Sequence, residues 1–140
     1  MQFPLIGGCQ CGAMRYEIAE APLRTYTCHC TDCQRITGSA FSLAIVVPDE
    51  EFRLTKGEPW LVQRLADSGR VVTRWLCRDC GSWVCSAAWA VPGQAPMRIV
   101  QGGSLDDRSW LRPTRHFWTR SKQPWVEIPA GDEVFETQPG

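Results

Sequence analysis

The chain contains 140 residues with a mass of 15.8 kDa, which is the size of one domain. Hydrophobic residues make up 44% and charged residues 21% of the chain, and this composition excludes a disordered protein. Fifteen basic residues balance fifteen acidic ones, so the zero net charge argues against a nucleic-acid or anionic-membrane surface.

The apolar pattern predicts short strands along most of the chain, at residues 14–18, 41–47, 52–55, 60–65, 70–76, 83–89, 97–101, 116–119 and 126–128. The segment Ala66-Asp67-Ser68-Gly69 consists of turn-forming residues and predicts a hairpin between 60–65 and 70–76. Helical turns are expected at 31–36 and 106–110, and prolines exclude long helices from the second half. The fold class is therefore all-β, or β-rich, with short antiparallel strands. We expect one domain over 1–129 and a loosely held polar tail over 130–140.

No apolar run approaches the roughly 18 residues of a membrane span. Residues 1–8 are too few for a signal peptide and lack its basic start. We therefore expect a cytoplasmic protein that has no membrane partner.

Eight cysteines carry most of the functional information, and seven of them form closely spaced clusters. Residues two or three apart make poor disulfides but good metal chelates, so a disulfide framework is the weaker interpretation. The segments Cys9-Gln10-Cys11-Gly12 and Cys77-Arg78-Asp79-Cys80-Gly81 look like two half-sites. Their four thiolates would complete a tetrahedral structural zinc site. A glycine after each second cysteine indicates a tight turn with a positive φ.

The remaining cluster is Cys28-His29-Cys30-Thr31-Asp32-Cys33, which offers three thiolates within six residues. Three protein ligands and an open position are typical of a reactive zinc that can activate a thiol. His116 or Cys85 could instead close this site, or the cluster could be a redox thiol group without metal. Cys85 is more simply a small buried residue, and His116 a hydrogen-bonded wall residue.

The role of His29 stays open between a supporting donor, an acid or base, and a solvated loop residue. Arg35, Arg74 and Arg78 lie near the clusters in sequence and are interpreted as solvated surface residues. Five tryptophans are interpreted as core or pocket walls, namely Trp83, Trp89, Trp110, Trp118 and Trp125.

Four segments together resemble the glutathione-dependent formaldehyde-activating enzyme family, whose domain is shared with centromere protein V of animals. Residues 7–16 are similar to its opening GGCxCGxxRY motif, and 28–39 to its CHCxxCRxxTGS motif, with Gln34 where the family often has Arg. Residues 75–82 resemble its FCxxCG motif, and 103–107 its GSLDD segment. His116, Phe117, Trp118 and Trp125 look like its closing pattern.

The resemblance implies the β-rich, Mss4-like zinc-containing fold. It assigns the structural zinc to Cys9, Cys11, Cys77 and Cys80, and a second, activity-linked zinc to Cys28, Cys30 and Cys33. It also implies a carbon–sulfur lyase or synthase that joins glutathione and formaldehyde into S-hydroxymethylglutathione. Candidate proton donors are His29, Thr31 and Ser39.

Two other functions remain open at this stage. A zinc-stabilised protein-binding module would close the second site with a fourth ligand, and a redox sensor would release zinc on oxidation. The expected partner is a small thiol such as glutathione. An exposed strand edge would also allow a homodimer.

Overall fold

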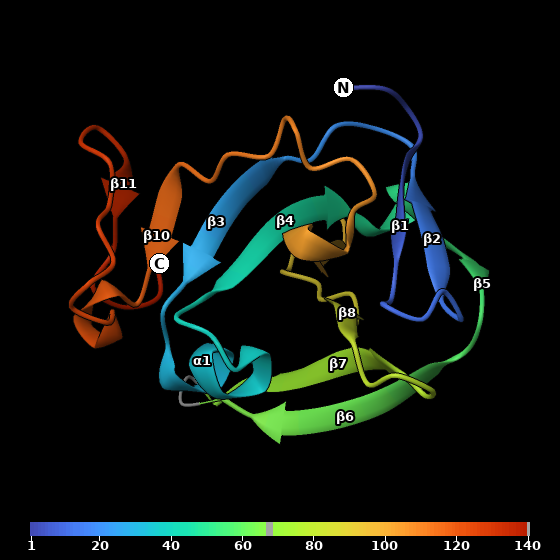
Figure 1. Cartoon of the computed structure of the whole chain (residues 1–140), viewed down its shortest axis with the longest axis horizontal. Helices are drawn as coiled ribbons and strands as arrows, with labels where there is room; N and C mark the ends of the chain where they lie inside the picture. The colour runs from blue at the N-terminus through green and yellow to red at the C-terminus, as the bar shows by residue number, and fades with distance from the viewer. Residues whose placement is uncertain (67–68, 140) are drawn as a thin grey trace.

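The computed structural model describes residues 1–66 and 69–139, and it confirms the expected β-rich fold. The described strands form two sheets, and the single α-helix among them is α1, Thr31–Thr37 (Figure 1). The smaller sheet has the order β1-β2-β5, with the bounds β1 Leu5–Gly8, β2 Arg15–Ile18 and β5 Phe52–Lys56. The larger sheet has the order β11-β10-β3-β4-β9-β8-β7-β6, with the bounds β3 Arg24–Cys28, β4 Ser42–Pro48, β6 Pro59–Leu65, β7 Val71–Cys77, β8 Trp83–Ser86, β9 Met97–Gln101, β10 Arg115–Phe117 and β11 Glu133–Val134. Short 3-10 helices occur at η1 Asp49–Glu51, η2 Gly102–Ser104 and η3 Thr119–Ser121.

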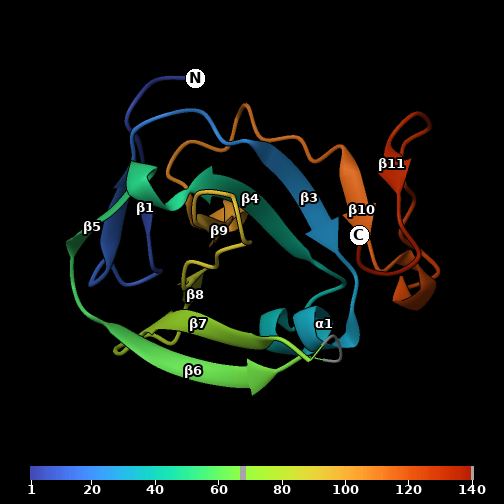
Figure 2. The ribbon, with the colours of Figure 1, turned by 180° about the vertical axis from the view of Figure 1, so that it is seen from behind.

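The smaller sheet lies at one side of the molecule, and β10 and β11 lie at the other (Figures 1 and 2). Both views place α1 close to the end of β6 and the start of β7. The hydrophobic core contains residues from both sheets, including Tyr16, Ile45 and Val100, none of them more than 1% exposed. Cys85 is fully buried in this core, which agrees with its interpretation as a small buried residue.

Helix α1 connects two neighbouring antiparallel strands, because β3 ends at Cys28 and its cross-strand partner Ser42 begins β4. The helix begins after Cys30, whose side chain caps it by accepting a hydrogen bond from the Cys33 amide. It ends at Gly38, which has the left-handed conformation (φ 63°) that glycine adopts without strain. The connection between β3 and β4 therefore gathers three cysteines at one end of the larger sheet.

Several expected elements form as predicted. Helix α1 covers the helical turn at 31–36, and β6 and β7 form the predicted hairpin, with β7 ending on Cys77. Residues 67 and 68 of the predicted turn lie outside the described residues. Among the described residues, no helix is long and apolar enough to cross a membrane.

Two of the elements predicted from the sequence do not form. No strand forms at 126–128, where the Lys122 ammonium donates to the Val126 carbonyl (2.7 Å) and Pro129 follows. No helix forms at 106–110, because the Asp107 carboxylate accepts from the Ser109 amide (3.0 Å) in a local turn.

The end of the chain also differs from expectation. Strands β10 and β11 pair in parallel, as do β10 and β3. Residues 130–139 are thus not simply loosely held, because β11 joins the sheet and the Phe135 ring packs edge-on against Phe117 at 5.4 Å. Sequence patterning overlooked this pairing, since the strands are only three and two residues long.

Candidate functional site

The first cysteine cluster joins the two sheets. The Sγ atoms of Cys9, Cys11, Cys77 and Cys80 all lie within 4.8 Å of one another. The Sγ atoms of Cys9 and Cys11 are 3.6 Å apart, and those of Cys11 and Cys77 are 3.7 Å apart. Zn–S bonds of about 2.3 Å at tetrahedral angles place sulfurs roughly 3.8 Å apart. The spacing of the four sulfurs therefore fits a tetrahedral metal site, and four thiolates are a donor set that suits zinc.

The backbone around this cluster is arranged for thiolates. Gly12 (φ 83°) and Gly81 (φ 77°) both have the positive φ that the sequence predicted. The Met14 amide donates to the Cys9 sulfur (3.2 Å), and the Asp79 amide donates to the Cys77 sulfur (3.4 Å). Hydrogen bonds to a sulfur stabilise its anionic form, which is the form that binds metal.

The second cluster lies at the start of α1. The Sγ atoms of Cys28, Cys30 and Cys33 also lie within 4.8 Å of one another. Cys28 is buried, whereas Cys30 and Cys33 are partly exposed. Hydrogen bonds from the Cys28 and Cys33 thiols, together with the Cys33 amide, lower the pKa of Cys30 to about 2. The cluster therefore favours a negative charge on Cys30 and can hold a metal ion.

A fourth protein ligand is absent from this cluster among the described residues. Cys85 lies in the core, where burial raises the pKa of its thiol to about 11. Both ring nitrogens of His116 are already occupied, Nδ1 by the Thr27 hydroxyl (2.7 Å) and Nε2 by the Asp132 carboxylate (2.8 Å). Neither alternative ligand suggested by the sequence joins the site.

The three cysteines open onto a cavity of about 690 Å³, a volume in the range typical of small-molecule sites. Its walls come largely from one face of the larger sheet, where alternate residues of β3, β4, β9 and β7 point to the same side. Trp83, Trp89 and Trp118 line it, as the interpretation of the tryptophans suggested, whereas Trp125 is 70% exposed. A second cavity, of about 720 Å³, borders Cys9 of the first cluster and contains none of the three cysteines of the second.

His29 lies behind the cluster and does not line this cavity. Three hydrogen bonds hold the residue: its amide donates to the Phe117 carbonyl (2.9 Å), its carbonyl accepts from Gln34 Nε2 (2.8 Å), and its Nε2 bonds the Thr27 hydroxyl (3.0 Å). Since His29 stands between Cys28 and Cys30, these bonds fix the positions of both thiols.

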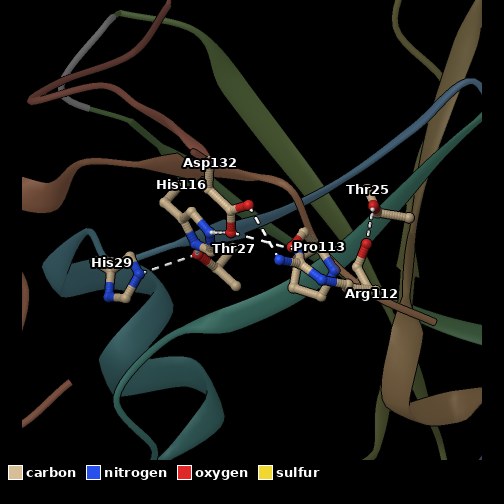
Figure 3. A network of polar contacts seen from close by, with 7 residues as sticks. All are labelled: Thr25, Thr27, His29, Arg112, Pro113, His116 and Asp132. Carbon is tan, nitrogen blue, oxygen red and sulfur yellow. Dashed lines mark hydrogen bonds and ion pairs between the residues drawn. The ribbon is translucent and has the colours of Figure 1, made fainter. Parts of the chain in front are cut away.

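A polar chain extends from His29 through Thr27 and His116 to Asp132 (Figure 3). The His116 imidazole and the Arg112 guanidinium hold the pKa of Asp132 below its usual value, so this carboxylate accepts from His116 Nε2–H. The Thr27 hydroxyl bonds both His116 Nδ1 and His29 Nε2, so it donates to one ring nitrogen and accepts from the other. Burial lowers the pKa of His29 to about 4, so this ring is neutral near pH 7. The His29 Nδ1 is buried and has no hydrogen-bond partner among the described residues.

Gln34 connects α1 to the chain after β10. Its amide nitrogen donates to the Ser121 carbonyl (2.9 Å) as well as to His29, and its oxygen accepts from Gln123 (3.0 Å). A glutamine can donate and accept at once, whereas an arginine at this position could only donate. Gln34 therefore fixes the base of the three-cysteine cluster.

Two features of the site were missed by sequence reasoning. Arg74 is not a solvated surface residue: it is only 7% exposed and lines the cavity. Thr27 and Asp132 complete the chain behind the cysteines, yet 105 positions separate them and no motif relates them. Burial of Arg74 follows from the pairing of β7 with β8 opposite Ser86, which a single sequence does not reveal.

Comparison with known proteins gives one family. Residues 4–121 match the family described as glutathione-dependent formaldehyde-activating enzyme. A protein of Talaromyces marneffei is 29% identical over 75% of this chain and 56% of its own length. A protein of Colletotrichum graminicola is 34% identical over 40% of this chain and 28% of its own length. Both carry the curated name "Putative glutathione-dependent formaldehyde-activating enzyme", and the chain matches about half of their length or less.

The fold also occurs in a solved structure. A crystal structure of a Rhodobacter sphaeroides protein superposes with a TM-score of 0.55 and covers 94% of this chain and 99% of its own. The two sequences are 18% identical, so this likeness concerns the fold alone.

Proposed function

The chain belongs to the glutathione-dependent formaldehyde-activating enzyme family, and on this premise we propose that it joins a small thiol such as glutathione to formaldehyde. The reverse reaction would make it a carbon–sulfur lyase. The observation that supports this proposal most strongly is the opening of three clustered thiols onto a cavity of about 690 Å³. A closed structural site would need a fourth ligand, which the described residues do not supply.

The proposed reaction needs no oxidant or reductant. The thiol loses its proton to solvent, and the resulting thiolate sulfur attacks the carbonyl carbon to form a carbon–sulfur bond. The π electron pair of the carbonyl moves to its oxygen, which takes up one proton and becomes the hydroxyl of the S-hydroxymethyl product. In the reverse direction the hydroxyl loses its proton, and the carbon–sulfur bond breaks to release the thiol.

Cys28, Cys30 and Cys33 would hold a zinc ion, whose charge lowers the pKa of a nearby thiol and favours its thiolate form. Cys9, Cys11, Cys77 and Cys80 would hold a second, structural zinc ion.

The remaining roles fall to residues around the cavity. Thr31 lines it beside the three cysteines, so we assign its hydroxyl as the donor of the proton to the new oxygen. Ser39 and His29 do not line the cavity. We assign to His29 the positioning of the two cysteines beside it.

Nuclear magnetic resonance of ¹³C-formaldehyde mixed with glutathione, with and without the protein, tests this function. The expected result is faster exchange between free formaldehyde and the S-hydroxymethyl adduct, lost in Cys30→Ser while the fold is retained. Thr31→Val should slow exchange less than Cys30→Ser, because water can replace one proton donor. Exchange equal to the uncatalysed rate in the metal-loaded wild type would contradict the proposal and favour a protein-binding module.

A further inference from the structure

The cavity at the three-cysteine cluster carries a local positive charge, although the whole chain is neutral. One acidic residue, Asp32, lines its described part, and Asp32 already pairs with Arg64 (2.7 Å). The arginines in its wall are Arg24, Arg70, Arg74, Arg115 and Arg120. Such a cavity favours an anionic ligand.

Arg74 is the buried arginine of this wall, and its guanidinium has no polar partner among the described residues. It is 7% exposed, and no hydrogen bond or ion pair joins its guanidinium to any described residue. Its Nε–H is fully buried and unsatisfied. The guanidinium lies over the Trp83 ring, 4.9 Å from the centroid, so stacking holds it in place. Burying an unpaired charge is unfavourable, and a ligand that supplies the partner would remove that cost.

Arg98 is a second buried arginine, with a purely structural role, and its polar contacts can be compared with those of Arg74. It is also 7% exposed, but it donates to Asp49 (2.7 Å) and to the Ser86 carbonyl (3.1 Å) and stacks on Trp75. The two arginines thus have equal burial and aromatic support but differ in their polar partners. The missing partner of Arg74 is specific to the cavity wall.

Gln101 gives a second observation at the same wall. This residue is 9% exposed, lines the cavity, and its buried Nε2 has no hydrogen-bond partner among the described residues. Arg74 lies on β7 and Gln101 on β9, with β8 between them. The residue of β8 opposite Arg74 is Ser86, whose small side chain also lines the cavity. Two unsatisfied donors therefore lie in one wall.

We propose that Arg74 and Gln101 form a subsite that binds a carboxylate of the thiol ligand whose sulfur reaches the three-cysteine cluster. This inference rests on the proposed function and adds to it two residues, Arg74 and Gln101, that would determine ligand specificity. The guanidinium donates two hydrogen bonds to the carboxylate oxygens, and the Gln101 amide donates a third. Hydrogen bonds to a charged group of this kind change affinity by about tenfold to a hundredfold.

Calorimetric titration of the metal-loaded protein with three thiols tests the subsite. The ligands are glutathione and 3-mercaptopropionate, which have carboxylates, and 2-mercaptoethanol, which has none. We expect Arg74→Gln to weaken binding of the first two ligands by about tenfold to a hundredfold and to leave 2-mercaptoethanol unchanged. Gln101→Glu, which places a carboxylate in the same wall, is expected to weaken the same two ligands. It provides an independent test should Arg74→Gln fail to fold.

Arg35→Gln is the matched control, because Arg35 is an exposed residue of α1 that does not line the cavity. It removes the same charge near the cluster and should leave all three affinities unchanged. The subsite would be overturned if Arg74→Gln bound glutathione as tightly as the wild type does. It would also be overturned if the variant lost affinity equally for all three thiols. If the wild type fails to accelerate formaldehyde exchange while 3-mercaptopropionate binding still depends on Arg74, the proposed function fails and the subsite stands. If none of the three ligands binds the wild type, both the proposed function and the subsite are overturned.

Discussion

The Sγ atoms of Cys11 and Cys77 lie 3.7 Å apart, although 66 positions separate them in the chain. Cys11 belongs to the turn between β1 and β2, and Cys77 ends β7. The contact therefore connects the smaller sheet to the hairpin arm of the larger one. A metal ion at this cluster would cross-link the turn after β1 to the end of β7.

Cys11→Ser tests this cross-link with little disturbance of packing, since Cys11 is exposed. We expect loss of one metal ion per chain and a fall in the free energy of unfolding of more than about 3 kcal/mol, because metal binding is coupled to folding. Metal analysis and denaturant unfolding measure both effects. Gln10→Ala, in the same loop, is the control. Full metal content with unchanged stability in Cys11→Ser would argue against a structural metal.

Cys30→Ser is expected to behave differently. The three-cysteine cluster borders a cavity and α1 has no buried residues, so its metal supports less of the core. The variant should lose one metal ion but keep its circular dichroism spectrum and most of its stability. Unfolding of Cys30→Ser as severe as that of Cys11→Ser would indicate that the second site is structural too.

Thr27→Val tests the chain of polar contacts behind the cluster. The substitution keeps the side-chain shape but leaves buried ring nitrogens of His29 and His116 without a partner. We expect a loss of about 1–3 kcal/mol in the free energy of unfolding. Thr25→Val is the control on the same strand, because its hydroxyl donates to the Arg112 carbonyl in an exposed bond (3.0 Å). An equal loss of unfolding free energy in Thr27→Val and Thr25→Val would contradict a stabilising role for the buried polar chain.

The lowered pKa of Asp132 leads us to expect that the stability of the fold depends on pH. Its pKa is lower in the folded protein than the ordinary value of 3.8, because His116 and Arg112 stabilise the carboxylate. The stabilisation is therefore fully present above about pH 4 and is lost as the pH falls through the folded-state pKa. Unfolding measured between pH 7 and pH 3 should show a smaller acid-induced loss in Asp132→Asn than in the wild type. Parallel curves for the two proteins would contradict this contribution.

The sequence predicted which cysteines come together better than it predicted the cavity around them. Closely spaced cysteines are a local signal, and they come together in space as their spacing indicated. The positive φ of Gly12 and Gly81 was likewise predictable from the tight turns. The hairpin formed by β6 and β7 followed from alternation around turn residues.

Features that depend on long-range pairing could not be predicted in this way. Strand β3 was overlooked although Thr25, Tyr26 and Thr27 favour strands, because its sequence RTYTC has no clear alternation of apolar residues. Arg74 was interpreted as solvated because its burial arises only when β7, β8 and β9 align. His116 and Asp132 meet only because β10 and β11 pair in parallel.

Native mass spectrometry of the purified chain, with and without glutathione, tests the central claim most directly. The account predicts two zinc ions per chain and a glutathione complex in the wild type. Cys30→Ser should retain one zinc ion and form no glutathione complex. A wild type that holds one zinc ion, and a Cys30→Ser variant identical to it in metal content and glutathione binding, would contradict the account.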